Sequence, residues 1–317
     1  MRIDELLKGV KTVGITGHER PDGDCVGSCM GMYLYIKKNY PKIRVDVFLE
    51  KIPPEYLFIK DTDLVRSDFV TDIDVYDMFI CLDSGKERTA GAEKLFDAAK
   101  KKVNIDHHMS NKGTGDELYI VSTASSACEL VYDVVDHDKL DIDIAKALYT
   151  GMVTDTGVFK YNNTSPKTMR VAAELIAYGF DFGSLIDHVF YEKTYLQNQI
   201  LGRALLESMM LMDGRCIVSV VSKQSMEFYG ADSNDLDGIV SQLLLTEGVD
   251  CAIFMYERAP LEYKVSLRST GAVNVAAIAE VFGGGGHMRA AGCTVNGTQH
   301  DVINNITKYI HRQLYAE

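Results

Sequence analysis

The sequence predicts an α/β fold in which a doubly wound, mainly parallel sheet is followed by a smaller α/β domain, with a helical linker between them. Three observations lead to this class. Short apolar runs alternate with helix-spaced segments over the first part of the chain. A helical stretch rich in Leu and Met follows, and the alternation restarts after Gly214. Because 317 residues suffice for about two domains, we expect domains at 1–187 and 213–317 with a linker at 188–212.

In the first domain, the predicted strands are short apolar runs at residues 12–17, 43–49, 78–82 and 103–105. The predicted helices have apolar residues at helical spacing, at 1–9, 24–40, 88–100, 124–135, 143–156 and 181–191. A further helix begins after Ser165, a good N-cap, with Pro166 at the first helical position and Gly179 at its end. Strands that alternate with helices imply a parallel, doubly wound sheet.

In the second domain, the same patterns predict strands at 215–221, 251–256, 263–268 and 293–295. They predict helices at 235–245, 273–282 and 302–315, and a helix at 196–212 in the linker. The glycines at 283–286, followed by His287, separate the second of these helices from the last strand. On its own this run is typical of a flexible helix-to-strand turn.

Acidic and imidazole side chains follow three predicted strands of the first domain. His18 to Asp24 forms the loop after the first strand, Asp83 follows the third, and Asp106-His107-His108 follows the fourth. In doubly wound sheets, ligands bind outside the carboxyl ends of the strands. These groups, far apart in the sequence, are therefore predicted to converge at one edge of the sheet.

Composition narrows the possible partners. The net charge is −12, from 45 acidic against 33 basic residues, and no basic stripe is visible, which argues against a long nucleic-acid strand as partner. No apolar run approaches the roughly 18 residues that a membrane span requires, and the charged N-terminus lacks a signal-peptide core. Seven cysteines at irregular spacings indicate reduced thiols in a cytoplasmic protein, not a disulfide framework.

The converging residues have the composition of a two-metal phosphoester site. Such a site needs oxygen ligands, some imidazoles and a carboxylate able to bridge ions about 3.5–4 Å apart. His18, Asp22 and Asp24 are spaced so that one loop could supply ligands to two ions. The other candidate ligands are Asp83, His107 and Asp155. Mixed His and Asp ligation suits Mn²⁺ better than an all-oxygen Mg²⁺ site, so we expect two divalent ions and favour Mn²⁺.

Each candidate has an ordinary explanation when taken alone. His18 could be a loop histidine, Asp83 part of a turn, and Asp155 a helix-end charge. Each explanation is adequate for its own residue, but all of them holding at once is a poor explanation of the whole set. Asp136-His137-Asp138 is equally rich in possible ligands, but it follows a helix, and we assign it to a solvated helix end.

Four motifs occur in an order that resembles the DHH phosphoesterase superfamily. They are His18-x-x-Pro21-Asp22-Gly23-Asp24, Asp83-Ser84, Asp106-His107-His108 and Thr154-Asp155-Thr156-Gly157. The second domain resembles the DHHA1 domain that follows the DHH domain in this superfamily. Its matching motifs are Ser266-Leu267-Arg268-Ser269 and the glycine run with His287, followed by Ala290-Ala291-Gly292. The resemblance covers the whole chain and is greatest to the stand-alone oligoribonuclease and pAp phosphatase group.

The resemblance implies a role for each residue of the first domain. One ion would be held by His18, Asp22 and Asp83. The second would be held by Asp24, Asp83, His107 and Asp155, with Asp83 as the bridge. A water or hydroxide between the ions would be the nucleophile. His108 would contact the scissile phosphate or assist the leaving group, and Asp106 would orient a neighbouring histidine.

The second domain is expected to bind the far phosphate or base of the substrate. Arg268 can make a bidentate contact with a phosphate, and His287 could add a contact. The glycines, with Gly284, Gly285 and Gly286 as candidates, allow backbone N–H groups to approach an anion. The alternative is a flexible turn beside a surface arginine. Arg88, Arg289 and Tyr161 are left out of the predicted site.

The resemblance implies metal-dependent hydrolysis of short RNA oligonucleotides (nanoRNA), of linear dinucleotides such as pApA, and of 3′-phosphoadenosine 5′-phosphate (pAp). A phosphodiesterase dedicated to cyclic or linear dinucleotides is the main alternative. An inorganic pyrophosphatase is disfavoured by the glycine run and Arg268. A non-catalytic nucleotide sensor is disfavoured because all six candidate ligands are present. The oligomeric state stays open, with a homodimer as one possibility.

Overall fold

The computed structural model describes residues 1–315, and the chain divides into two compact units, Met1–Glu192 and Lys193–Glu317. The expected linker at 188–212 spans this division. Its helix, α8 (Tyr195–Leu206), belongs to the second unit, where Ile200 and Ala204 pack into an apolar cluster.

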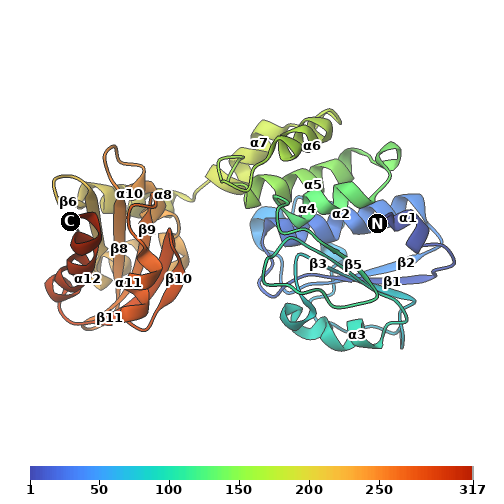
Figure 1. Ribbon diagram of the computed structural model, residues 1–317, viewed down its shortest axis with the longest axis horizontal. Helices are drawn as coiled ribbons and strands as arrows, with labels where there is room; N and C mark the ends of the chain where they lie inside the picture. The colour runs from blue at the N-terminus through green and yellow to red at the C-terminus, as the bar shows by residue number, and fades with distance from the viewer. Residues whose placement is uncertain (316–317) are drawn as a thin grey trace. The chain divides into compact units, whose positions relative to one another are not determined.

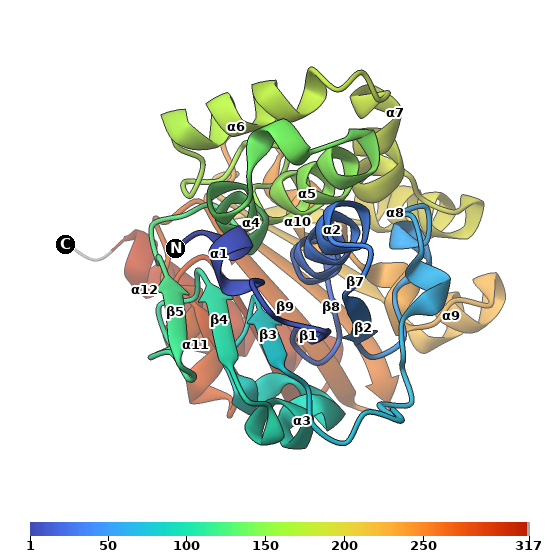
Figure 2. The ribbon, with the colours of Figure 1, turned by 90° about the vertical axis from the view of Figure 1, so that its right-hand side faces the viewer.

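The first unit contains a five-stranded parallel sheet in the order β2-β1-β3-β4-β5 (Figure 2). Its strands are β1 (Thr12–Thr16), β2 (Arg44–Phe48), β3 (Met78–Leu82), β4 (Lys102–Asp106) and β5 (Glu117–Ile120). The central strand β3 is buried at every position, which explains its continuous apolar sequence. The edge strand β5 was not predicted; its sequence contains the short apolar run Leu118–Ile120, but none of its residues is buried.

Helices cover both faces of this sheet, as expected for a doubly wound fold (Figure 1). The α-helices are α1 (Ile3–Leu6), α2 (Gly23–Asn39), α3 (Glu93–Ala98), α4 (Ala127–Val134), α5 (Ile142–Asp155), α6 (Pro166–Ile176) and α7 (Phe182–Ile186). The 3-10 helices are Pro54–Tyr56, Thr62–Leu64, Lys86–Arg88, Ala90–Ala92 and His137–Lys139, and Asp187–Tyr191 is a π-helix. Helices α2, α4 and α5 share the main core, whereas α3 packs on the opposite face through a smaller aromatic cluster. Ser165 caps α6 and Pro166 is its first residue, as predicted.

The single helix predicted at 88–100 is wrong. Two 3-10 helices precede α3 there, and Ala90 has a left-handed φ of 52° that an α-helix cannot include. Gly91, in the second of these 3-10 helices, packs directly against the ring of Phe69, because a Cβ at residue 91 would lie only 2.7 Å from that ring.

The second unit contains a six-stranded mixed sheet in the order β10-β11-β9-β8-β7-β6, in which only β7 and β8 run parallel. Its strands are β6 (Met209–Leu211), β7 (Cys216–Val221), β8 (Cys251–Ala259), β9 (Glu262–Ser269), β10 (Gly285–His287) and β11 (Ala290–Asn296). Its remaining helices are α9 (Lys223–Tyr229), the 3-10 helix Ser233–Leu236, α10 (Ile239–Leu244), α11 (Val275–Val281) and α12 (Gln299–Leu314). One core cluster lies between the sheet and α11 with α12, and another involves α8 and α10.

Three short elements of this unit were not predicted. Residues 209–211, expected to be helical, form the edge strand β6, and the expected glycine turn contains the strand β10. Helix α9 begins at the N-cap Ser222 and ends at Gly230, which has a φ of 66°. Short edge strands and a seven-residue helix carry too few residues to show a period. Among residues 1–315, no helix is both long and apolar enough to cross a membrane.

Candidate metal centre

The ends of β1, β3, β4 and α5 bring the six predicted ligands together. The Nε2 atom of His18 lies 3.3 Å from Asp83 Oδ2 and 3.5 Å from Asp22 Oδ1. The Nε2 atom of His107 lies 3.3 Å from Asp83 Oδ1. It also lies 3.6 Å from Asp24 Oδ2 and 3.8 Å from Asp155 Oδ2. Asp83 therefore faces both imidazoles, one through each carboxylate oxygen.

Asp24 is held between three helices. It lies in the first turn of α2 and is almost fully buried, and its carboxylate accepts hydrogen bonds from the backbone N–H groups of Ala127 (2.6 Å) and Cys128 (2.9 Å). These two residues begin α4, so the partial positive charge of that helix end stabilises the carboxylate. Gly151 of α5 makes room, because a Cβ there would lie 2.7 Å from Asp24 Oδ1.

Asp22 has a structural role as well as a place in the cluster. Its Oδ1 accepts hydrogen bonds from the N–H groups of Asp24 and Cys25, each at 3.1 Å, so it is the N-cap of α2. Gly23 follows because a Cβ there would lie 2.3 Å from Thr154 Oγ1 on α5. The Asp22-Gly23-Asp24 sequence thus both starts the helix and positions two carboxylates.

Asp83 adopts a strained backbone. Its φ is 56°, in the left-handed region, and its side chain is 2% exposed. Its Oδ1 is buried, and although ring nitrogens of His107 and His108 lie 3.3 Å and 3.5 Å away, no hydrogen bond of normal geometry reaches it within the described residues. A buried anionic oxygen without a donor is costly unless a cation compensates it. This is the clearest sign that the cluster is built around a cation.

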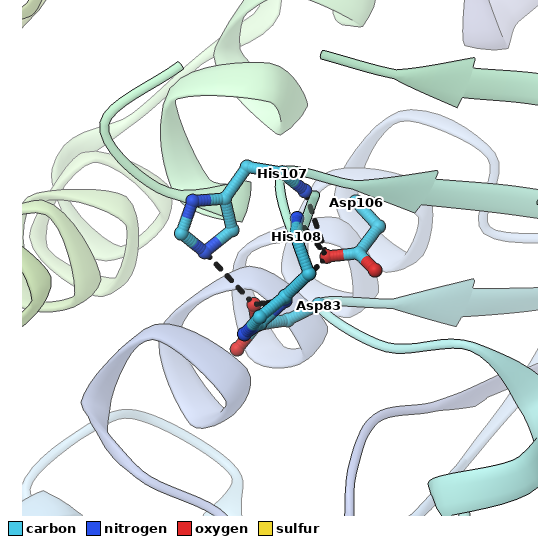
Figure 3. Close-up of side chains that lie close together, drawn as sticks. All are labelled: Asp83, Asp106, His107 and His108. Carbon is cyan, nitrogen blue, oxygen red and sulfur yellow. Dashed lines mark hydrogen bonds and ion pairs between the residues drawn. The ribbon is translucent and has the colours of Figure 1, made fainter. Parts of the chain in front are cut away.

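Asp106 is the best-satisfied carboxylate of the group (Figure 3). Its Oδ1 accepts from the backbone N–H groups of His107 (2.7 Å) and His108 (3.1 Å), and lies 2.8 Å from His108 Nδ1. Its Oδ2 accepts from Asn111 Nδ2 at 2.6 Å. Asp106 thus fixes the imidazole of His108, which is 37% exposed and lies 3.5 Å from Asp83 Oδ1.

Asp155, the last residue of α5, is anchored by Asn163. The Asn163 Nδ2 donates to the backbone oxygen of Asp155 at 3.1 Å and to that of Ser125 at 2.9 Å, and lies 3.4 Å from Asp155 Oδ2. The Asp136-His137-Asp138 segment, by contrast, forms a 3-10 helix in which the His137 Nε2 lies 2.9 Å from the backbone oxygen of Tyr132.

The pKa shifts follow from burial and mutual charge. Burial, and then the charges of Asp83 and Asp155, raise the pKa of Asp24 well above its usual value. Burial raises the pKa of Asp155 to about 6. Burial would lower the pKa of His107, but its close contact with Asp83 and the charge of Asp24 raise it to about 10. For Asp106, burial is outweighed by hydrogen bonds from His108 and Asn111, which lower its pKa.

The donor set fits divalent cations. Ligand atoms about 2.1 Å from one ion lie roughly 3–3.5 Å from each other, close to the spacings found here. Three close groups of possible ligand atoms occur in the described residues: Asp83 with Asp106, His107 and His108; His18 with Cys25 and Asp83; and Asp24 with His107 and Asp155. Asp83 and His107 each belong to two of these groups, so the three groups form one connected cluster.

Sequence reasoning missed three residues of this region. Asn111 and Asn163 support Asp106 and Asp155, and the buried thiol of Cys25 lies beside His18 and Asp83. Asparagines in loops are most often turn residues, so neither carried a distinguishing signal.

The predicted substrate residues lie together in the second unit. Arg268 of β9 pairs with Ala290 of β11, which pairs with His287 of β10, so all three project to one face of the sheet. Gly284 allows this packing, since a Cβ there would lie 2.1 Å from the backbone oxygen of Gly292. Gly286 has a φ of 148°, and a Cβ at Gly285 would meet no atom within 4 Å.

The comparisons with known proteins agree with the geometry. The profile of the DHH family, N-terminal domain, matches residues 12–152, and that of the DHHA1 domain matches residues 213–316. The chain is 31% identical to the bifunctional oligoribonuclease and PAP phosphatase NrnA of Thermus thermophilus, over 94% of this chain and 89% of that protein. It is 26% identical to the cyclic-di-AMP phosphodiesterase PdeA of Listeria monocytogenes, over 91% of this chain but 45% of that protein.

A solved structure with the same fold covers nearly the whole chain. An exopolyphosphatase-related protein from Bacteroides fragilis superposes with a TM-score of 0.84 at 22% identity, covering 98% of this chain and 94% of that one. The two family profiles cover the residues of both candidate sites except Asp155, which lies just beyond the end of the DHH profile. The chain therefore belongs to the DHH/DHHA1 phosphoesterase superfamily, together with the NrnA-type proteins.

Proposed function

We propose that this protein is a Mn²⁺-dependent phosphodiesterase that hydrolyses short oligoribonucleotides, including linear dinucleotides such as pApA, and removes a phosphate from pAp. The observation that carries the proposal is the buried Asp83 carboxylate. It faces His18 through one oxygen and His107 through the other, and the second oxygen accepts no hydrogen bond of normal geometry although His107 Nε2 lies 3.3 Å away. This arrangement supports two cations that share one ligand.

In this proposal His18, Asp22 and Asp83 hold one ion. Asp24, Asp83, His107 and Asp155 hold the other. Bound divalent ions lower the pKa of a coordinated water and offset the charge of a phosphate. The mixture of imidazole and carboxylate ligands supports Mn²⁺ over Mg²⁺ as the resident ion.

His108 is the residue available to the scissile phosphate. Its ring is more exposed than that of His107, and the bond between its Nδ1 and Asp106 leaves Nε2 to face substrate. This bond and the charges of Asp83 and Asp106 raise the pKa of His108, so that it can donate a proton to a leaving oxygen. Asp106 acts through His108 by fixing its orientation.

The second unit binds the substrate. Arg268 and His287 provide charge and hydrogen-bond donors on one face of the sheet, and the backbone of 284–286 is open to an anion. All seven cysteines are unpaired and buried, which supports a reducing compartment, the cytoplasm, as the place of action.

The test is a turnover assay with Mn²⁺ and a set of substrates: pAp, pApA, a five-nucleotide RNA, a long single strand, cyclic di-AMP and pyrophosphate. We expect hydrolysis of the first three, with inhibition by a chelator. Turnover of cyclic di-AMP alone would replace the proposal with a dedicated cyclic-dinucleotide phosphodiesterase. Turnover of pyrophosphate alone would mean that the role of the second unit was misread, and tight nucleotide binding without turnover would favour a sensor.

A further inference from the structure

The strand β9 has one face in the core of the second unit and one face that is partly exposed, although the neighbouring strand β8 packs against α10 on that second side through Ala252 and Phe254. Its residues alternate in exposure along the strand. Tyr263, Val265 and Leu267 are buried in the core beneath α11 and α12. Lys264, Ser266 and Arg268 point to the opposite face because successive strand residues alternate sides. Lys264 is exposed, and Ser266 and Arg268 are half-buried.

The strand pairing extends this face across β11 and β10. Arg268, Ala290 and His287 form one row across the three strands. Lys264 and Thr294 form a second row, four residues away along β9 and β11. Residues directly paired in an antiparallel sheet project to the same side. The two rows therefore lie on one surface.

Between these rows lies a third one, in which Ser266 pairs with Gly292 and Gly292 with Gly285. No side chain in it is larger than that of serine. A Cβ at Gly285 would meet no atom, and Gly292 is not buried. The surface between Arg268 and Lys264 is therefore not blocked by side chains of these three strands.

Lys264 makes no ion pair within the described part of the chain, where no carboxylate oxygen lies within 4 Å of its Nζ. It lies four residues from Arg268 along β9, which is about 13 Å at the rise of a strand. A mononucleotide held at the Arg268 row need not reach Lys264, whereas a chain of several nucleotides laid along β9 passes it.

We propose that Lys264 binds a backbone phosphate of an oligoribonucleotide at a position farther along the strand than the phosphate bound at Arg268 and His287. The inference rests on the proposed function and adds to it a subsite that only longer substrates occupy. Lys264 is then a length-specificity residue: it increases the affinity for oligomers and leaves pAp and dinucleotides unaffected.

The experiment compares Lys264→Gln and Lys264→Arg with the full-length parent. Lys308→Gln is the matched control, because Lys308 is exposed on α12, which packs on the opposite face of the same sheet. Steady-state kcat/KM is measured with Mn²⁺ for pAp, pApA and a five-nucleotide RNA. The Kd of a fluorescein-labelled five-nucleotide RNA is measured by anisotropy in EDTA, over a range of salt concentrations.

We expect Lys264→Gln to lower kcat/KM for the five-nucleotide RNA about tenfold, with values for pAp and pApA within twofold of the parent. The slope of log Kd against log salt concentration should become shallower by about 0.7, as for the loss of one phosphate contact to a single strand. Lys264→Arg should restore both values, and Lys308→Gln should change neither.

Two outcomes would overturn the proposal: an equal loss on all three substrates, or an unchanged salt slope in Lys264→Gln. The binding measurement keeps the two proposals apart. If the parent hydrolyses nothing but its RNA binding still depends on Lys264, the proposed activity fails and the subsite stands. If the parent hydrolyses all three substrates but Lys264→Gln behaves like the parent, only the subsite fails.

Discussion

Replacement of Asp83 by Asn tests the central claim about the site. Asn keeps the shape of the side chain and tolerates a left-handed backbone, so the φ of 56° can be retained. The substitution removes the charge that faces both His18 and His107. If Asp83 bridges two ions, their binding should weaken strongly. We expect turnover of pApA to fall at least about a hundredfold, because loss of a residue that merely supports a ligand already costs 10–100-fold in affinity or activity.

The same variant has a stability readout that does not depend on activity. A ligand present at about 100 times its Kd stabilises the folded state by about 2.7 kcal/mol. For a unit of this size, 1 kcal/mol shifts Tm by about 2–4 °C, so Mn²⁺ should raise the Tm of the parent by roughly 5–10 °C. In Asp83→Asn most of this shift should disappear, as measured by differential scanning calorimetry with and without Mn²⁺.

Two further variants make the result specific. Asp83→Ala should lose the metal response equally, but its metal-free form should be less stable than Asp83→Asn by about 1 kcal/mol, because alanine tolerates the left-handed region poorly. Asp138→Asn, an exposed charge change on the 3-10 helix His137–Lys139, should behave like the parent. A metal-induced Tm shift in Asp83→Asn equal to that of the parent, or turnover within tenfold of it, would refute the bridging role.

Four other predictions follow from the geometry. Metal affinity should fall as the pH drops through about 6, because burial raises the pKa of Asp155 to that value and the carboxyl group must lose its proton before it can bind an ion. Calorimetric titration with Mn²⁺ at pH 5 and at pH 7.5 measures this affinity. Equal affinities at the two pH values would contradict the prediction. The stability of the metal-free protein should depend on pH in the opposite direction. The pKa of Asp155 in the folded state exceeds its unfolded value of 3.8, so this residue should increase the free energy of unfolding as the pH falls from about 6 toward 4. Asp106→Asn should lower kcat roughly 10–100-fold while retaining the metal-induced Tm shift, since Asp106 orients His108; loss of that shift would make Asp106 a ligand instead. Gly285→Val should raise the KM for pApA with an unchanged Tm, because a Cβ at residue 285 would meet no atom within 4 Å. Gly284→Ala should instead lower the Tm, because a Cβ at residue 284 would lie 2.1 Å from a backbone oxygen. Melting curves and initial rates distinguish the two effects.

Much of the first unit could be predicted from the sequence because its strands are continuous apolar runs. β1, β3 and β4 are located within a residue or two of their predicted positions, and the groups that follow them meet at one edge, as a parallel sheet requires. Asp155 is different, since it ends a helix and no strand-end rule selects it. It entered the predicted site through its joint occurrence with the other motifs.

The supporting residues were beyond sequence reasoning for a physical reason. Asn111 and Asn163 act through hydrogen bonds to side chains and backbone atoms brought near by folding, and a single asparagine gives no sign of its partner. The glycine run shows a related limit. Four successive glycines are typical of a flexible turn, yet the last two of them belong to β10, because β11 supplies the hydrogen bonds of that strand and Gly284 packs closely against Gly292.

The charges around the site explain why a cation should be required. Asp22, Asp24, Asp83, Asp106 and Asp155 converge, and within residues 1–315 their only ion-pair partners within 4 Å are histidines. Elsewhere in this unit carboxylates pair with lysine or arginine, as Asp97 does with Lys86, apart from the exposed Glu192, which pairs with His188. Histidine can supply charge only by keeping a proton on the nitrogen that would otherwise coordinate a metal. A bound cation replaces that proton, and the imidazole then becomes a ligand of the ion that neutralises its neighbours. The fold thus leaves compensation of these carboxylates to protons or metal ions, and at neutral pH divalent metal ions are the stronger competitor for so many converging oxygens.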